Sequence, residues 1–164
     1  MQSKNESDQE LIYGVNALRF LPGYLLQRGI NKIIIVRGHY SFPSVINDSF
    51  WPDKLKIITI IADEGLPAIN KIKSKYESIK SHLPSLIVAI GGGMVIDTAK
   101  TIIFHSIQDG RVGSELIAIP TTAGSGSEAT PFAVVYNGKQ KQSLEENALL
   151  PSTVFLDPML TGSL

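Results

Sequence analysis

Two glycine-rich turns carry the residue types that could bind a phosphorylated ligand. The first turn, Gly91–Gly93, follows the apolar run Leu86–Ile90 and precedes Val95–His105, a segment with helical spacing. Glycine has no Cβ atom, so backbone N–H groups at this helix start can approach a phosphate closely, and the helix start adds a partial positive charge. The turn therefore predicts a seat for a pyrophosphate. A tight strand-to-helix turn without a ligand has the same pattern, and this alternative stays open.

The second turn spans residues 120–130 and follows another apolar run, Leu116–Ile119. Glycine lets its backbone wrap around a ligand, and hydroxyl side chains supply donors and acceptors that suit ribose hydroxyls, phosphates and a carboxamide. These hydroxyl side chains are Thr121, Thr122, Ser125 and Ser127. A Ser/Gly loop in which Ser125 and Glu128 merely form a capping box is the alternative interpretation.

The elements that must position these turns follow from the hydrophobic pattern. Near-continuous apolar runs are typical of parallel strands covered on both faces. Such runs occupy 32–36, 56–61, 86–90, 116–119 and 133–136, with a weaker one at 153–156, and helical patterns occupy 16–28, 66–83 and 95–105. The alternation predicts a doubly wound α/β sheet with helices on both faces. Because ligands bind at the carboxyl ends of the strands of such a sheet, both turns are expected to face one crevice.

The composition excludes several classes of partner. Charged residues make up 18% of the 164 residues and the formal net charge is zero, so no long-range field attracts nucleic acid or an acidic membrane. The chain has no cysteine, its polar start lacks the apolar stretch of a secretory signal, and no long apolar run predicts a membrane span. We expect one cytoplasmic domain over 1–164, with residues 1–10 flexible, whose partner is a small molecule or another protein.

The segments GGGMVIDTAK (91–100) and PTTAGSGSEAT (120–130) closely resemble the paired signatures of the iron-containing (group III) alcohol dehydrogenases. The pairs Tyr13-Gly14 and Leu21-Pro22 are similar to the family's opening pattern, and LDPMLT (156–161) is similar to the segment that closes its first domain. The resemblance implies a Rossmann-like, mostly parallel α/β domain of the dehydroquinate synthase-like N-terminal type. Complete members add a helical metal-binding domain, which we expect to be absent here.

The resemblance also implies which residues bind the cofactor, a nicotinamide dinucleotide. Pyrophosphate contacts are carried over to the first turn, nicotinamide and ribose contacts to the second, and further contacts to positions along the same groove. The candidate residues are Gly38, Gly91, Gly92, Gly93, Met94, Asp97, Thr121, Thr122, Ser125, Val134, Lys141 and Leu160. Met94 stands where the family usually has serine, which removes a hydroxyl but leaves the backbone donors. We expect weaker affinity with an unchanged binding mode.

Gly38 bears on the choice between NADP and NAD. Members that prefer NAD commonly have an aspartate at this place, which accepts hydrogen bonds from the ribose 2′-hydroxyl and would repel a 2′-phosphate. Glycine tolerates the phosphate, and Arg37, His39 or Ser41 could pair with it. We therefore expect a preference for NADP. The alternative is that Arg37 and His39 are ordinary solvated loop residues.

The resemblance implies reversible hydride transfer between the nicotinamide and a small alcohol or aldehyde, with a divalent metal, iron or zinc, polarising the oxygen. In the family the metal ligands lie in the helical domain. His39, His82 and His105 are scattered and lack the spacing of a metal site, so we expect none in this chain and assign no catalytic residue. We interpret the chain as a truncated protein, a degenerate gene product or one half of a split enzyme. Apolar surface bared by the missing half predicts self-association or a homodimer.

Two competing interpretations come from other functional classes. Dehydroquinate synthase-like lyases share the GGG turn, but an apolar, lysine-bearing loop follows their PTT, where this chain has AGSGSEAT. The second competitor is a non-catalytic fragment that binds a nucleotide or a protein partner. The segment 139–151 is more similar to reductases of small polar or phosphonate-bearing aldehydes than to alkanol enzymes, although Lys139 also fits an ordinary solvated turn.

Overall fold

The computed structural model describes residues 9–39, 43–44, 46–83 and 85–161. Six parallel strands form one sheet in the order β1-β8-β5-β4-β2-β3. The strands are β1 (Glu10–Tyr13), β2 (Lys32–Arg37), β3 (Lys56–Ile61), β4 (Leu86–Gly91), β5 (Leu116–Pro120) and β8 (Thr153–Leu156). Because all six run in the same direction, their carboxyl ends lie at one edge of the sheet.

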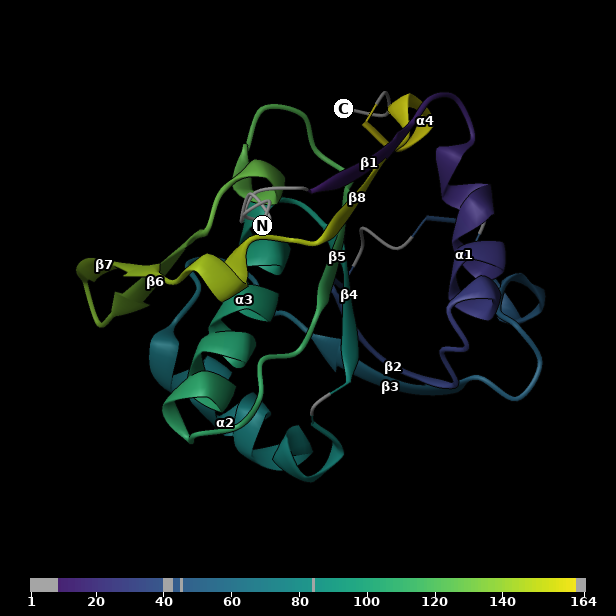
Figure 1. Cartoon of the computed structure of the whole chain (residues 1–164). Helices are drawn as coiled ribbons and strands as arrows, with labels where there is room; N and C mark the ends of the chain where they lie inside the picture. Colours follow the sequence, from purple (N-terminus) through teal and green to yellow (C-terminus); the bar gives the residue numbers. More distant parts are fainter. Residues whose placement is uncertain (1–8, 40–42, 45, 84, 162–164) are drawn as a thin grey trace, which may run out of the picture.

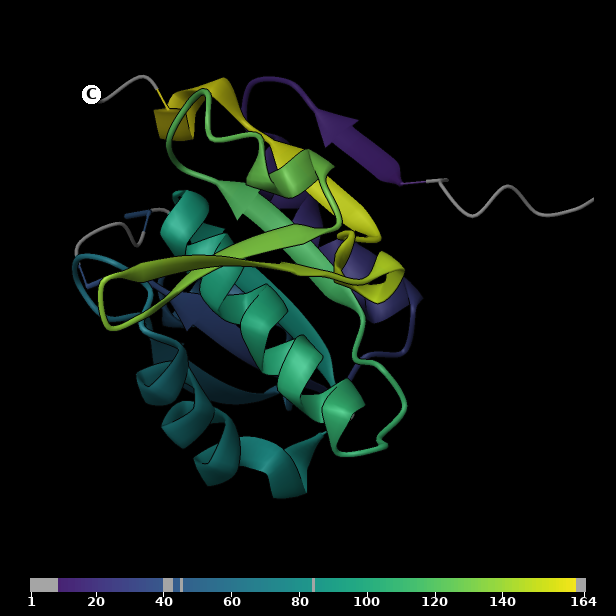
Figure 2. The same ribbon diagram turned by 90° about the vertical axis from the view of Figure 1, so that its left-hand side faces the viewer.

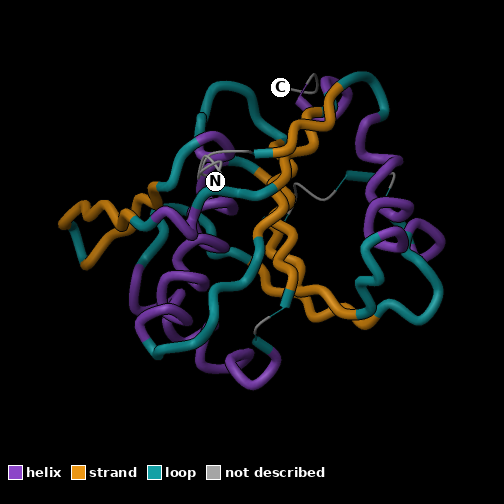
Figure 3. Tube along the Cα trace, viewed as in Figure 1, coloured by secondary structure: helices purple, strands orange, loops and turns teal. Residues whose placement is uncertain are grey.

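Helices cover both faces of this sheet (Figures 1 and 3). Helix α1 (Leu21–Gln27) lies on one face, and α2 (Ile69–Ile79) and α3 (Gly93–Gln108) lie on the other. Short elements complete the fold: η1 (Ala17–Phe20), η2 (Asp48–Phe50), η3 (Lys80–His82), η4 (Ser127–Ala129), η5 (Asn147–Leu149) and α4 (Pro158–Thr161). The predicted doubly wound α/β fold is confirmed, and the described residues contain no separate helical domain.

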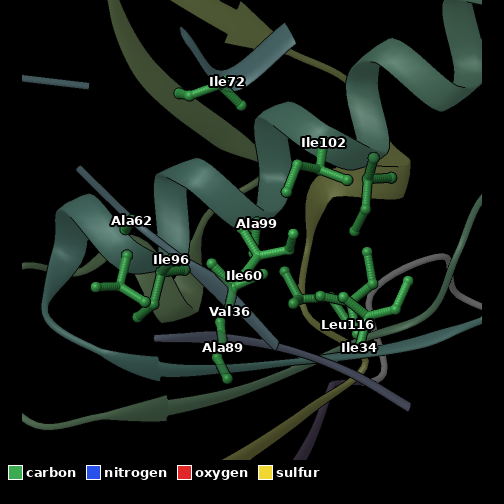
Figure 4. Packing of buried hydrophobic residues seen from close by; sticks show 14 of the residues in the cluster. Ile34, Val36, Ile60, Ala62, Ile72, Ala89, Ile96, Ala99, Ile102 and Leu116 are labelled. Atoms are coloured by element: carbon green, nitrogen blue, oxygen red, sulfur yellow. The ribbon is translucent and has the colours of Figure 1, made fainter. Parts of the chain in front are cut away.

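Two hydrophobic cores lie on opposite sides of the sheet because side chains alternate along each strand. In β2, Ile33 packs with α1 while the next residue, Ile34, belongs to the core under α2 and α3. Figure 4 shows this second core, where Ile96 and Ile102 of α3 face side chains of the sheet. The buried apolar side chains of the helical patterns predicted at 66–83 and 95–105 therefore anchor α2 and α3, and with them the turn that precedes α3.

The run 133–136 was predicted to belong to the parallel sheet, and that prediction is wrong. It lies in β6 (Phe132–Asn137), which pairs antiparallel with β7 (Gln140–Glu145) in a separate hairpin. Figure 2 shows this hairpin crossing over α3. Only alternate β6 residues, Ala133 and Val135, are fully buried, because one face of the hairpin packs on the helix. Lys139 lies in the hairpin turn, in agreement with its interpretation as a residue of an ordinary solvated turn.

Some element boundaries differ from the predicted ones. The helical pattern 16–28 divides into η1 and α1, and Leu66 is exposed before α2 begins. Strand β1 falls partly in the segment expected to be flexible: residues 1–8 lie outside the described part, whereas the Gln9 side-chain amide donates to the carbonyls of Glu128 and Pro151 at 2.7 and 2.9 Å. Within the described ranges, no helix has the length and apolar character needed to cross a membrane.

Candidate functional site

A pocket of about 530 Å³ opens at the carboxyl ends of strands β2 to β5. Strand β2 lies between β3 and β4, so the chain reverses its direction of progress through the sheet at this point. Such a switch point is where open α/β sheets bind ligands. The pocket is lined by Gly38, His39, Ala62, Asp63, Glu64, Gly92, Gly93, Met94, Val95 and Thr122. Five of the sequence-predicted residues therefore meet here: Gly38, Gly92, Gly93, Met94 and Thr122.

The two glycine-rich turns pack directly against each other. Strands β4 and β5 are paired in the register Gly91↔Pro120, which brings the two turns side by side. A Cβ atom added at Gly92 would lie 2.9 Å from Thr122 Oγ1, and one added at Gly93 would lie 2.9 Å from Ser125 Cβ. These glycines are thus required for contact between the turns. The prediction that both turns face one crevice is confirmed, and small side chains line the contact between them.

Helix α3 presents its N-terminus to this pocket. The residue before the helix, Gly92, has no capping side chain, and the first turn contains no acidic residue. The first N–H groups of a helix lack acceptors within it, and they carry the positive end of the dipole of a helix sixteen residues long. Met94, which replaces the hydroxyl of the family pattern, is half exposed at this rim. The arrangement suits an anion bound by backbone donors.

The second turn is fixed at both ends and open between them. At its start, Thr121 N–H donates to Gly91 O at 3.0 Å, and at its end Ser127 Oγ donates to Asp97 Oδ1 at 2.5 Å. Between these anchors Gly124 and Gly126 adopt positive φ angles of 83° and 67°, which lets residues 122–126 arch over the first turn. The arch therefore places the side chains of Thr122 and Ser125 beside Gly92 and Gly93 at the start of α3.

Ser125 and Glu128 do not form the capping box considered from the sequence. Ser125 Oγ donates to Glu128 Oε2 at 3.2 Å, so the two side chains do meet. However, the residue before η4 is Gly126, and Ser125 Oγ accepts from the N–H of Ser127 at 3.4 Å. The hydroxyl of Thr121 is buried and has no hydrogen-bond partner within the described residues. Thr121 thus brings an unused polar group to the end of β5.

Seven predicted residues are absent from the pocket lining: Gly91, Thr121 and Ser125 belong to the two turns, and the other four lie farther away. Both carboxylate oxygens of Asp97 are used within the protein, because Oδ1 accepts from Ser127 and Oδ2 accepts from the N–H of Val134 at 3.1 Å. Lys141 is exposed on β7, and Leu160 lies in α4 and packs against the core under α1. Asp97 and Val134 therefore connect α3 to the hairpin, which is a role that the sequence did not reveal.

Acidic residues at the end of β3 were missed from the sequence. Asp63 and Glu64 line the pocket beside Gly38, and Asp63 pairs with Lys75 at 3.2 Å. Arg37 Nη1 donates to Gly38 O at 3.0 Å, whereas Ser41 lies outside the described residues. The sequence did offer a signal for Asp63 and Glu64, because they follow an apolar strand that ends at the same edge of the sheet as the glycine turns.

The described part of the chain holds no group of three or more His, Cys, Asp or Glu side chains that could bind a metal ion. His105 lies on α3 against the ring of Tyr76, with 5.8 Å between ring centroids, and burial lowers the pKa of its imidazole. His82 lies in η3, away from the pocket that His39 lines. The residues present therefore do not fit a metal centre.

Comparison with known proteins identifies the class of this chain. The family model described as "Iron-containing alcohol dehydrogenase" matches residues 8–158. The 1-propanol dehydrogenase of Citrobacter freundii is 37% identical over 99 residues, which cover 59% of this chain and 27% of that protein. The phosphonoacetaldehyde reductase of Streptomyces viridochromogenes is 30% identical over 185 residues, which cover 87% of this chain and 46% of that protein.

A solved structure has the same fold. Sulfoacetaldehyde reductase from Bifidobacterium kashiwanohense, in complex with NAD⁺, superposes with a TM-score of 0.84 at 23% identity, over 100% of this chain and 48% of that one. The chain belongs to the iron-containing alcohol dehydrogenase family. It spans less than half of the length of each of these relatives.

Proposed function

We propose that this chain is the nicotinamide dinucleotide-binding part of a metal-dependent alcohol dehydrogenase or aldehyde reductase. The observation that carries the proposal is the direct packing of the two glycine turns, which open one pocket at the N-terminus of α3. That pocket joins backbone donors for phosphate to the hydroxyl of Thr122, and the hydroxyl-bearing Ser125 lies beside it against Gly93, which suits ribose and carboxamide. The assignment of this pocket to a dinucleotide rests on the chemistry of these groups and on the family.

The residues of the pocket fit the parts of such a cofactor. Gly92, Gly93 and Met94 would hold the pyrophosphate through their backbone N–H groups, because no side chain caps the start of α3 with a hydrogen bond. Thr122 and Ser125 would bind the nicotinamide ribose and carboxamide. When bound, the cofactor supplies the carbon that donates or accepts a hydride.

This chain's own residues would bind and orient the reactants. The arch 122–126 would fix one face of the nicotinamide ring, so that only one side of it is open to substrate. The described residues offer no metal centre, and we derive no metal-assisted step from them. We assign no catalytic residue among the described residues.

The cofactor preference that we propose is for NADP. Gly38 presents no side chain to the pocket, which leaves room for a 2′-phosphate. Glu64 lies at the same pocket and its carboxylate opposes a second negative charge, so the preference is expected to be moderate. The substrate that we propose is a small alcohol or aldehyde, since two relatives are named for 1-propanol and phosphonoacetaldehyde.

Titration of the whole chain with NADPH and NADH, followed by nicotinamide fluorescence, tests the proposal. We expect saturable binding of both, tighter for NADPH, and no alcohol oxidation when iron, zinc or manganese is added. The absence of binding by either dinucleotide would overturn the proposal, and equal affinities would overturn the preference. Turnover by this chain alone would show that we have missed a metal centre.

A further inference from the structure

Lys100 has an unusual environment for a lysine. It lies in the middle of α3, and none of its side chain is exposed to solvent. Its Nζ atom donates to three backbone carbonyls, those of Ser127, Thr130 and Phe132, at 2.5, 2.6 and 2.7 Å. The three N–H bonds of an ammonium group are therefore all used, and none of them goes to a carboxylate.

The three carbonyls belong to the segment that ends the second turn and begins β6. Asp97, one turn earlier on α3, accepts from the Oγ of Ser127 and the N–H of Val134. Together Asp97 and Lys100 hold this segment with five hydrogen bonds. Asp97 accepts two of them and Lys100 donates three. The second anchor of the arch 122–126 lies in this segment, and Ser125 of the arch packs closely against Gly93.

We infer that Lys100 is a positioning residue for the dinucleotide site, which holds the arch 122–126 over the start of α3 only while its amine is protonated. This inference rests on the proposed function, because it concerns affinity for the dinucleotide. A neutral amine has two N–H donors and a lone pair. Deprotonation would leave one of these three buried or partly buried carbonyls without a donor and facing that lone pair, and the segment 127–132 would loosen.

The charge on Lys100 is sensitive to moderately alkaline conditions. Burial lowers the pKa of this amine to about 8, against the opposing effects of the nearby carboxylates of Asp97 on α3 and Glu128 on η4. Strand β6 contributes the carbonyl of Phe132 to its surroundings. Between pH 7 and 9.5 the protonated fraction would fall about thirtyfold. Because only the protonated form is binding-competent, the apparent affinity for a dinucleotide would fall in proportion.

The test is the pH dependence of NADH and NADPH binding by the whole chain, measured by fluorescence from pH 6.5 to 9.5. We expect the dissociation constant to be about doubled near pH 8 and to reach up to about thirtyfold its low-pH value at pH 9.5. Lys100→Met should bind weakly at pH 7 and lose this dependence, whereas Lys71→Met, at an exposed position of α2, should keep the wild-type profile. A dissociation constant that is constant over this range, or an unchanged profile in Lys100→Met, would overturn the inference.

Amide hydrogen exchange at residues 122–132 keeps the inference testable if Lys100→Met fails to fold or if no dinucleotide binds. After correction for base-catalysed exchange, protection in the wild-type chain should fall near pH 8 in this segment and stay constant in β4. Protection that is independent of pH would contradict the role of Lys100. Failure to bind any dinucleotide at any pH, together with such a local loss of protection, would refute the proposed function but support the protonation-dependent anchor.

Discussion

A substitution at Gly92 tests whether the first turn binds the pyrophosphate or only makes a tight bend. A methyl group at this position would meet Thr122 Oγ1 at 2.9 Å and would enter the space beside the start of α3. We expect Gly92→Ala to raise the dissociation constant for NADPH at least about tenfold, or about 1.4 kcal/mol, because the arch must move away from the helix start. Fluorescence titration measures this effect.

The matched control is Gly113→Ala, whose added Cβ atom would make an ordinary contact with Ala148 at 3.9 Å. This variant should bind like the wild-type chain. Thermal unfolding of both variants shows whether a loss of binding reflects a loss of structure. Unchanged affinity in a folded Gly92→Ala variant would mean that this turn does not seat the pyrophosphate.

Glu64 decides how well the pocket tolerates a 2′-phosphate. Its carboxylate is exposed at the pocket rim beside Gly38, so the charge acts through solvent and its effect is modest. We expect Glu64→Gln to improve affinity for NADPH relative to NADH about threefold at low salt, and less at 0.5 M salt. Glu146→Gln, another exposed position, is the control. An unchanged ratio of the two affinities would place the 2′-phosphate elsewhere.

At the level of elements, Asp157 joins the two ends of the described chain. Its buried carboxylate accepts from the N–H groups of Asn16, Leu18 and Met159 at 3.1, 3.2 and 3.1 Å, which fixes η1 and α4 on the end of β8. We expect Asp157→Ala to lower the free energy of unfolding by about 2–4 kcal/mol, because buried N–H groups lose a charged acceptor. Urea unfolding measures this change, and Asp53→Ala at an exposed site should change it little. An equally small change for Asp157→Ala would show that these bonds do not stabilise the fold.

We predict that His105, which lies on α3 against Tyr76 of α2, makes the stability of the folded chain depend on pH. Burial lowers the pKa of this imidazole in the folded chain, so the unfolded chain takes up a proton first as the pH falls. The stabilising contribution is fully present above about pH 6.5 and decreases below it. Urea unfolding at pH 7.5 and 5.5 should show a smaller loss of stability for His105→Gln than for the wild-type chain. Equal losses would assign the pH dependence to other groups.

The sequence was most informative where local pattern and tertiary environment agree. The unit β4, turn and α3 was predicted because an apolar run, glycines and helical spacing follow one another. Strand β1 was missed because its four residues gain their stability from pairing with β8, about 140 positions later. The run in β6 has the composition of a core strand, but it pairs with β7 and packs on α3, and neither partner can be read from the run itself. The roles that we propose for Glu64 and Lys100 depend on spatial neighbours, which no local spacing encodes.

At the level of the whole molecule, large apolar side chains remain exposed on segments that Asp157 holds together. They are Tyr13, Val15, Phe20 and Met159, which are 76%, 65%, 67% and 66% exposed. Exposed apolar surface of this kind is typical of an interface. Since the chain spans less than half the length of the relatives described above, further protein is expected to cover such a surface in them. We therefore predict that the isolated chain self-associates as its concentration rises.

Size-exclusion chromatography with light scattering tests this prediction over a range of concentrations. The double substitution Val15→Gln and Phe20→Gln should shift the chain towards the monomer, because both exposed side chains belong to the segment 15–20 whose backbone Asp157 holds. Val112→Gln is the matched control, since Val112 is 79% exposed but precedes the amino end of β5, at the opposite edge of the sheet. If the control disperses the assembly as well as the double variant does, the contact is unspecific. A wild-type chain that stays monomeric at every concentration would show that these side chains tolerate water without a partner.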